Sequence, residues 1–220
     1  MWSLFNPDNK FAQFVIKFVD TLIVSFFWII LSLTVIGFGP ATMALYHTCV
    51  KVIRRDRGTL VKEFFGSIRE GWKTALPVGI FALILIASGI MIDIPNFLIL
   101  FIHDTTGQLI YGILSAVKLF IALGILIYIF PLMSRFRVGM VKAVILSVFF
   151  AFRHFLTTII LVLGTALAIY ASANTPLLVF IMPALYMLGV SCLMEKILKK
   201  HMTKEDKELD PNRDQWYLEV

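Results

Sequence analysis

The stretch VIGFGPATMALYHTCVKVIRRDRG, Val35–Gly58, decides how this chain folds. It follows a long apolar run, begins with two glycines and a proline, and ends in a cluster of arginines. As a helix, Gly39–Arg55 would rise ~25 Å, just short of the ~30 Å hydrocarbon core of a membrane. It is therefore either a short crossing or a helix on the membrane surface, and the choice sets the side on which every later segment lies.

Composition indicates an all-α integral membrane protein. Of the 220 residues, 59% are hydrophobic and only 15% are charged, and the mean hydropathy is +0.88. Such a chain has too few polar residues to form the solvated surface of a soluble protein. We expect one transmembrane helical domain over residues 1–198 and a cytoplasmic C-terminal tail over residues 199–220. The apolar finish of the tail, Trp216–Leu218, predicts that it packs on a cytoplasmic surface.

Five further apolar runs are long enough to cross a membrane, or nearly so. They are Thr21–Ile36, Leu76–Ile92, Leu109–Met133, Phe155–Ala171 and Pro176–Met194. The linkers differ in charge: Lys51–Lys73 holds seven Lys or Arg, Arg135–Arg153 holds four, the chain from Lys196 holds six, and Asp93–Gln108 and Ala171–Thr175 hold none. By the positive-inside rule, the basic segments are cytoplasmic and the two uncharged or acidic linkers lie outside.

This assignment bears on the opening stretch, because the segment after it is inside while Lys10 and Lys17 favour a cytoplasmic N-terminus. A crossing by Gly39–Arg55 reconciles the two. The sequence thus predicts a bundle of about six spans with both termini cytoplasmic. The alternative is a surface helix with the N-terminus outside.

The two large basic linkers match at an offset of 80 residues. The matched pairs are Arg55 with Arg135, Arg57 with Arg137, Lys62 with Lys142, and Lys73 with Arg153. This pattern predicts a parallel internal repeat whose units each hold a cytoplasmic interfacial helix. The alternative is that the basic residues of the two linkers match by chance.

The first interfacial helix is predicted within Gly58–Lys73, where apolar residues share one face. The expected docking residues of the two linkers are Phe64, Phe65, Ile68, Trp72, Arg135 and Arg137. They either contact a partner protein or lie among anionic lipid headgroups, which attract basic segments.

Lys118 lies about ten residues from each of Gln108 and Tyr128, near the membrane midplane. A lysine at that depth costs ~2.5–3.5 kcal/mol, which favours a paired or hydrated interior position. We expect Lys118 to line a polar cavity with His47 and with Tyr46 or Tyr128. Snorkelling of its own stem towards the outer surface is the alternative.

Known catalytic motifs are missing from the sequence. It holds neither a phosphate-binding Gly-rich loop nor a zinc HExxH motif. His47 and Cys49 are too near in sequence to form a catalytic pair by themselves, and Cys49 and Cys192 read as buried thiols. We expect no catalytic residue, metal or cofactor. The basic residues flank predicted spans, so we expect lipid partners and not nucleic acid.

Three short motifs lie along the chain: Asn6-Pro7-Asp8 with Phe11, Gly39-Pro40-Ala41-Thr42 with Ala44-Leu45-Tyr46, and Phe130-Pro131-Leu132 followed by Arg135-Phe136. Together they resemble the YesL-like family of small bacterial membrane proteins. The resemblance covers essentially the whole chain. It implies a bacterial plasma-membrane protein, often encoded among carbohydrate-uptake genes of the ABC-importer type, without known catalytic or binding residues.

The leading expectation is therefore a non-enzymatic accessory subunit or assembly partner of a carbohydrate importer, with permease subunits as partners. The alternative is a transporter or binding protein for a small or lipid-like solute. A membrane enzyme is a weaker third reading, because no acid, base and nucleophile fall on neighbouring faces.

Overall fold

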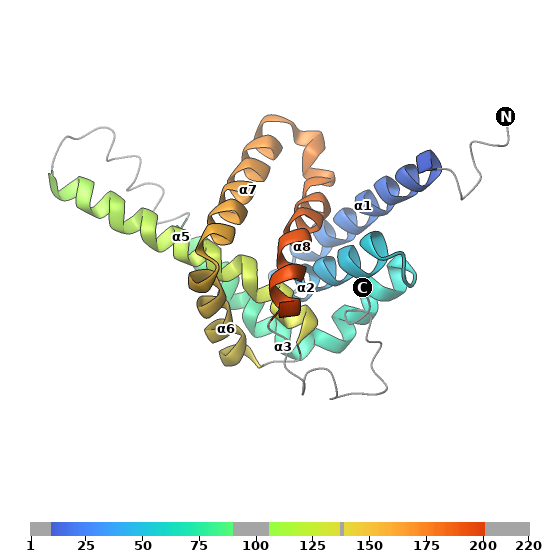
Figure 1. The fold of residues 1–220 in the computed structure, drawn as a ribbon, viewed down its shortest axis with the longest axis horizontal. Helices are drawn as coiled ribbons and strands as arrows, with labels where there is room; N and C mark the ends of the chain where they lie inside the picture. Colours follow the sequence, from blue (N-terminus) through green and yellow to red (C-terminus); the bar gives the residue numbers. More distant parts are fainter. Residues whose placement is uncertain (1–9, 90–105, 137–138, 201–220) are drawn as a thin grey trace.

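The computed structural model describes residues 10–89, 106–136 and 139–200, and these fold into helices with no strand among them (Figure 1). In chain order the helices are α1 (Lys10–Ser32), α2 (Phe38–Thr48), the π-helix η2 (Cys49–Arg54), α3 (Leu60–Ser88), α5 (Thr106–Arg135), α6 (Met140–Arg153), α7 (Phe155–Asn174), the 3-10 helix η4 (Pro176–Phe180) and α8 (Met182–Lys200). Arg137, most of the predicted outer linker, and the tail beyond Lys200 lie outside the described residues.

The first two helices form an antiparallel hairpin. Near the turn, the Trp28 indole N–H donates a hydrogen bond to Thr42 Oγ1 at 3.1 Å. At the other end, Lys17 Nζ lies 2.9 Å from Asp56 Oδ2. Helix α1 begins at Lys10 instead of Thr21, so the expected start was wrong. Apolar residues recur through residues 10–20 with the spacing of a helix, and they extend the span beyond its most apolar part.

Helices α2 and η2 form the central helix of the protein. From Gly39 to Ile53 every residue is buried except His47, which is half-buried. Helices α1, α3, α5 and α8 all pack around this segment. A helix enclosed on several sides by other helices cannot lie with one face in the headgroup layer. The burial therefore counts against the surface-helix interpretation, while the crossing itself stays a prediction.

Two glycines allow α2 and α3 to pack backbone against backbone. A Cβ atom added at Gly79 would lie 2.5 Å from Gly39 Cα, and one added at Gly39 would collide with the Ala75 carbonyl oxygen. Small residues permit this close approach between membrane helices, as at other glycine-lined contacts. The contact seats the central helix directly on α3.

Helix α3 joins two elements that the sequence analysis separated. The predicted interfacial helix within Gly58–Lys73 and the predicted span from Leu76 form one helix, Leu60–Ser88. Residues between them are compatible with a helix, and the helix continues through Pro77, although a proline there lacks the N–H donor and its ring clashes with the carbonyl four residues earlier. In the second half of the chain, the linker helix α6 and the following span α7 stay separate helices. The break lies at His154, whose φ and ψ are −111° and 48°. The two halves thus differ here, and the repeat is not confirmed.

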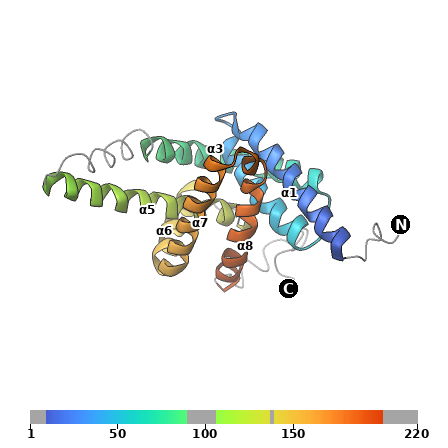
Figure 2. The same cartoon turned by 90° about the horizontal axis from the view of Figure 1, so that it is seen from above.

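The helices leave the centre of the molecule as diverging pairs. Helices α7 and α8 lie side by side, joined by a hydrogen bond of 2.7 Å between the Thr165 and Tyr186 hydroxyls (Figure 1). The C-terminal half of α3 and the N-terminal half of α5 project together in another direction (Figure 2). The space between α5 and α7 therefore widens away from the centre.

Four of the described helices are long and apolar enough to cross a membrane. They are α1, α3, residues Gly112–Arg135 of α5, and α7, and at most 28% of the most apolar stretch of each is buried inside the protein. This indicates a membrane protein. Of the six predicted spans, the central helix and α8 do not reach these limits of length and composition. The central helix is short, and α8 ends in a charged segment, Glu195–Lys200.

The glycine contact predicts a specific loss of stability. In Gly79→Ala the new methyl group meets the α2 backbone, so we expect a destabilisation of ~1–3 kcal/mol. The matched control is Gly66→Ala on the same helix, where a Cβ atom meets nothing within 4 Å. Because alanine favours a helix over glycine by ~1 kcal/mol, the control should be neutral or stabilising. Unfolding midpoints in detergent measure both, and equal midpoints for the two variants would contradict this packing.

Candidate functional site

A buried carboxylate at Glu195 joins three helices and the turn after η2. Its Oε1 accepts a hydrogen bond of 3.0 Å from the Tyr46 hydroxyl. Its Oε2 accepts hydrogen bonds from Arg55 Nη2 at 3.2 Å and Arg135 Nη1 at 3.1 Å. Arg135 is only 2% exposed. We name these four residues the Glu195 cluster.

Local helix geometry places these side chains together. Arg135 is the last residue of α5, and Arg55 directly follows η2. One turn before Glu195, the Ser191 carbonyl oxygen accepts a hydrogen bond of 2.9 Å from Arg54 Nη1. Residues four apart lie on one helix face, so α8 presents both acceptors to the end of the central helix.

A second carboxylate, Glu63, holds the central helix to α3. Lys51 Nζ lies 2.9 Å from Glu63 Oε2, and His47 Nε2 lies 3.4 Å from the same oxygen. His47 and Lys51 are one turn apart on the central helix, whereas Glu63 is in the first turn of α3. A carboxylate is also stabilised at a helix N-terminus. These three residues are the Glu63 cluster.

Both clusters connect helices through hydrogen bonds between charged side chains. Each carboxylate already accepts hydrogen bonds from basic side chains of a neighbouring segment. Within the described ranges, no group of three His, Cys, Asp or Glu side chains could hold a metal ion. Cys49 is buried as expected, whereas Cys192 is exposed, contrary to expectation. The clusters fix the relative positions of α3, α5 and α8 around the central helix.

The four residues expected to line one polar cavity have different neighbours. Tyr46 and Tyr128 are both completely buried and belong to one core cluster. The Tyr128 hydroxyl lies 3.2 Å from Thr158 Oγ1, so it does not face Glu195 as Tyr46 does. His47 faces Glu63 instead.

Lys118 is exposed on α5, a helix long and apolar enough to span a membrane. Exposure on such a helix argues against the interior position that the sequence suggested. The described contacts thus favour two separate carboxylate clusters over one shared cavity.

The predicted docking residues divide between the core and the surface. Phe64 is completely buried and Ile68 half-buried, because both pack against α1 and the central helix. Phe65 and Trp72 are exposed, at 46% and 40%, and Val61 is exposed beside them. Arg135 is buried in the Glu195 cluster, so it is not part of an exposed docking surface, and its place at the membrane interface stays a prediction. We name Val61, Phe65 and Trp72 the exposed α3 stripe.

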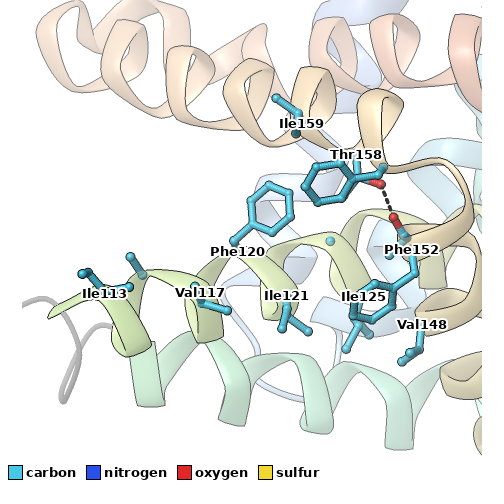
Figure 3. Close-up of a pocket in the computed structure, with 13 residues that line it drawn as sticks. Ile113, Val117, Phe120, Ile121, Ile125, Val148, Phe152, Thr158 and Ile159 are labelled. Carbon is cyan, nitrogen blue, oxygen red and sulfur yellow. Dashed lines mark hydrogen bonds between the residues drawn. The ribbon is translucent and has the colours of Figure 1, made fainter. Parts of the chain in front are cut away.

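An apolar cleft of about 520 Å³ lies between α5, α6 and α7 (Figure 3). Its lining is Ile113, Ala116, Val117, Phe120, Ile121, Gly124 and Ile125 of α5, Val148, Ala151 and Phe152 of α6, and Phe155, Thr158 and Ile159 of α7. The one hydroxyl in this lining, Thr158 Oγ1, already bonds the Ala151 carbonyl oxygen at 2.9 Å. The cleft therefore offers almost purely apolar surface.

Sequence reasoning missed Glu195 and the cleft. Glu195 directly follows the apolar run of α8 and precedes Lys196, so it resembles the solvated end of a span. One signal was available, because this acidic residue lies among several basic ones at the predicted cytoplasmic side. The cleft has no such signal, since its residues look like any other apolar helix face.

The Glu195 cluster predicts a large effect of Glu195→Gln. Loss of the carboxylate takes this counter-charge from the buried Arg135 and the half-buried Arg55, and breaking a buried ion pair typically costs ~3–5 kcal/mol. The matched control is Asp56→Asn, which removes the exposed pair with Lys17 and should cost less than ~1 kcal/mol. Denaturation of the two variants in the same detergent measures the difference. A Glu195→Gln variant as stable as Asp56→Asn would show that the cluster does not hold the helices.

Comparison with known proteins gives one family match. The family described as "Protein of unknown function, DUF624" matches residues 21–93. No curated protein and no solved structure matches the chain. The matched segment runs from within α1 past the end of α3, so it contains the whole central helix and the Glu63 cluster. Over this segment the chain is similar to the DUF624 family.

Proposed function

We propose that the chain is a non-enzymatic accessory subunit or assembly partner of a bacterial carbohydrate uptake system of the ABC type. The resemblance to the YesL-like family motivates the choice of system, and the similarity to DUF624 is compatible with it. The observation that carries the docking role is the exposed α3 stripe, which lies on a helix that the Glu63 cluster and the glycine contact hold in place.

The exposed α3 stripe has the properties of a protein-binding surface. Aromatic residues are enriched at interfaces, and rigid aromatic side chains lose little entropy on binding. Phe65 is held in place by ring contacts with Phe27 and Phe64, each at 5.5 Å between centroids. Basic side chains at Lys62, Arg69 and Lys73 surround the stripe. A partner with an apolar groove and an acidic rim would complement it.

The proposed topology has six spans in the bacterial plasma membrane, with both termini in the cytoplasm. The central helix is then the short second crossing, shielded from lipid by α1, α3, α5 and α8. The basic residues of both clusters and the exposed α3 stripe fall at the cytoplasmic end. This side is where a subunit could meet the cytoplasmic parts of an importer.

Two single cysteines test the topology, after Cys49 and Cys192 are replaced by serine. Thr34 lies in the turn between α1 and α2, and Thr59 precedes α3; both are exposed. If the central helix crosses the membrane, an impermeant thiol reagent in intact cells should label Thr34→Cys and not Thr59→Cys. A surface helix would place both residues on the same side, so equal labelling would reject the second crossing.

Photo-crosslinking tests the docking role. A photoreactive amino acid at Phe65 or Trp72 should form adducts with permease subunits when the chain and the importer are produced together. The matched control is Ile84, which is exposed on the apolar part of the same helix and should give no such adduct. Phe65→Ala combined with Trp72→Ala should weaken co-purification by about ten-fold or more, as expected for interface hot spots. Adducts at Ile84 alone, or none, would contradict docking through this stripe.

A second candidate function is binding of a lipid-like solute. The cleft between α5, α6 and α7 favours it, because pockets of 300–1,000 Å³ with apolar walls are typical of small-molecule sites. The sequence suggested a polar cavity at the midplane for this role, whereas the cleft is apolar.

A further inference from the structure

We propose that the cleft between α5, α6 and α7 binds one acyl chain of an anionic phospholipid, whose phosphate is held by Arg153. This site is separate from the exposed α3 stripe. The proposed topology is needed only to say which leaflet supplies the lipid, and that leaflet is the cytoplasmic one.

The length of the cleft fits one lipid chain. Along α5 the lining runs from Ile113 to Ile125, a rise of ~18 Å at ~1.5 Å per residue. Half the ~30 Å hydrocarbon core is ~15 Å, the depth that a chain reaches within one leaflet. Midway along the α5 lining, Phe120 meets Phe155 with ring centroids 5.8 Å apart. Figure 3 shows Ile113 at one end of the lining and Val148 near the other.

The walls exclude polar ligands. A sugar or an amino acid leaves unpaired polar groups when it enters an apolar pocket, at a cost of a few kcal/mol for each group. The Thr158 hydroxyl already lies within hydrogen-bond distance of the Ala151 carbonyl oxygen and Tyr128, so it is a poor partner for such a ligand. A hydrocarbon chain needs no such partner.

Charge selects an anionic headgroup. Arg153 is exposed at the α6–α7 junction, between Phe152 and Phe155, which both line the cleft. Its guanidinium carbon lies 5.5 Å from the ring centroid of Phe149, which is outside the lining, so a bound phosphate has to draw this flexible side chain from Phe149 to the edge of the cleft. Helices α5, α6 and α7 contain no Asp or Glu that would repel a phosphate. A basic group next to an apolar groove complements a phospholipid, because that lipid carries a negative phosphate and a hydrocarbon chain in one molecule.

The test uses the full-length protein reconstituted in vesicles of equal parts phosphatidylglycerol and phosphatidylcholine with identical chains. After gentle purification, mass spectrometry counts the retained lipids. One basic residue contributes ~1 kcal/mol to an anionic lipid, so the wild type should enrich phosphatidylglycerol about five-fold. Arg153→Gln should return the ratio to that of the vesicles, whereas Lys142→Gln, an exposed basic residue of the same helix, should not.

A second pair of variants tests the cleft itself. Val117→Trp fills it and should abolish the retained phosphatidylglycerol, while Leu163→Trp, on an exposed face of α7 outside the lining, should not. Val117→Phe, a smaller obstruction, repeats the test if the tryptophan variant does not fold. Glycerol phosphate, a headgroup without chains, should not compete.

Four results would overturn the proposal: equal retention of both lipids by the wild type, unchanged retention in both Val117 variants, equal losses in Arg153→Gln and Lys142→Gln, or displacement by glycerol phosphate. Crosslinking of a second copy through the cleft would do the same. None of these results bears on crosslinking at Phe65, so the two proposals fail independently.

Discussion

The arrangement of helices depends on one buried carboxylate, Glu195. It accepts hydrogen bonds from Tyr46, Arg55 and Arg135, so it fixes the end of the central helix to both α5 and α8. Removing charges from water is costly, and the cost is offset only where opposite charges meet in good hydrogen-bond geometry. The helices are therefore constrained to the one arrangement that brings both guanidinium groups to this carboxylate. The position of α5 set here in turn fixes one wall of the cleft.

The sequence predicts the helical class and several helices well, for clear physical reasons. Long apolar runs bounded by polar residues predict α5 and α7 to within a few residues, because a continuous apolar run of this length is typical of a single membrane helix. Helix α3 was divided because its amphipathic and uniformly apolar halves look like different elements, although no residue between them stops a helix. Glu195 and Arg135 could not be paired from sequence, since 60 residues separate them and their meeting depends on how α5 and α8 pack.

A search by length and hydropathy finds the helices whose apolar side chains are not buried by protein. The central helix, which is the most buried, does not reach the limits of that search. In the most apolar stretches of α1, α3, α5 and α7 at most 28% of the residues are buried inside the protein, so these stretches must be compatible with hydrocarbon. The central helix is enclosed by protein, and two of its polar side chains find protein partners: Thr42 bonds Trp28, and Lys51 bonds Glu63. Such a helix can be short and can carry charge, because the surrounding helices replace lipid as its solvent.

The two halves of the chain differ in how tightly their helices pack, and this difference places the cleft. Gly39 and Gly79 let α2 and α3 meet at their backbones, which leaves no space between them. Between α5 and α7, bulkier side chains meet: the ring centroids of Phe120 and Phe155 lie 5.8 Å apart, and Ile159 forms part of the cleft wall. Large side chains keep two helix backbones farther apart than glycines do. The cleft therefore lies where helices meet through bulky side chains, whereas the helices that meet through glycines leave no such groove.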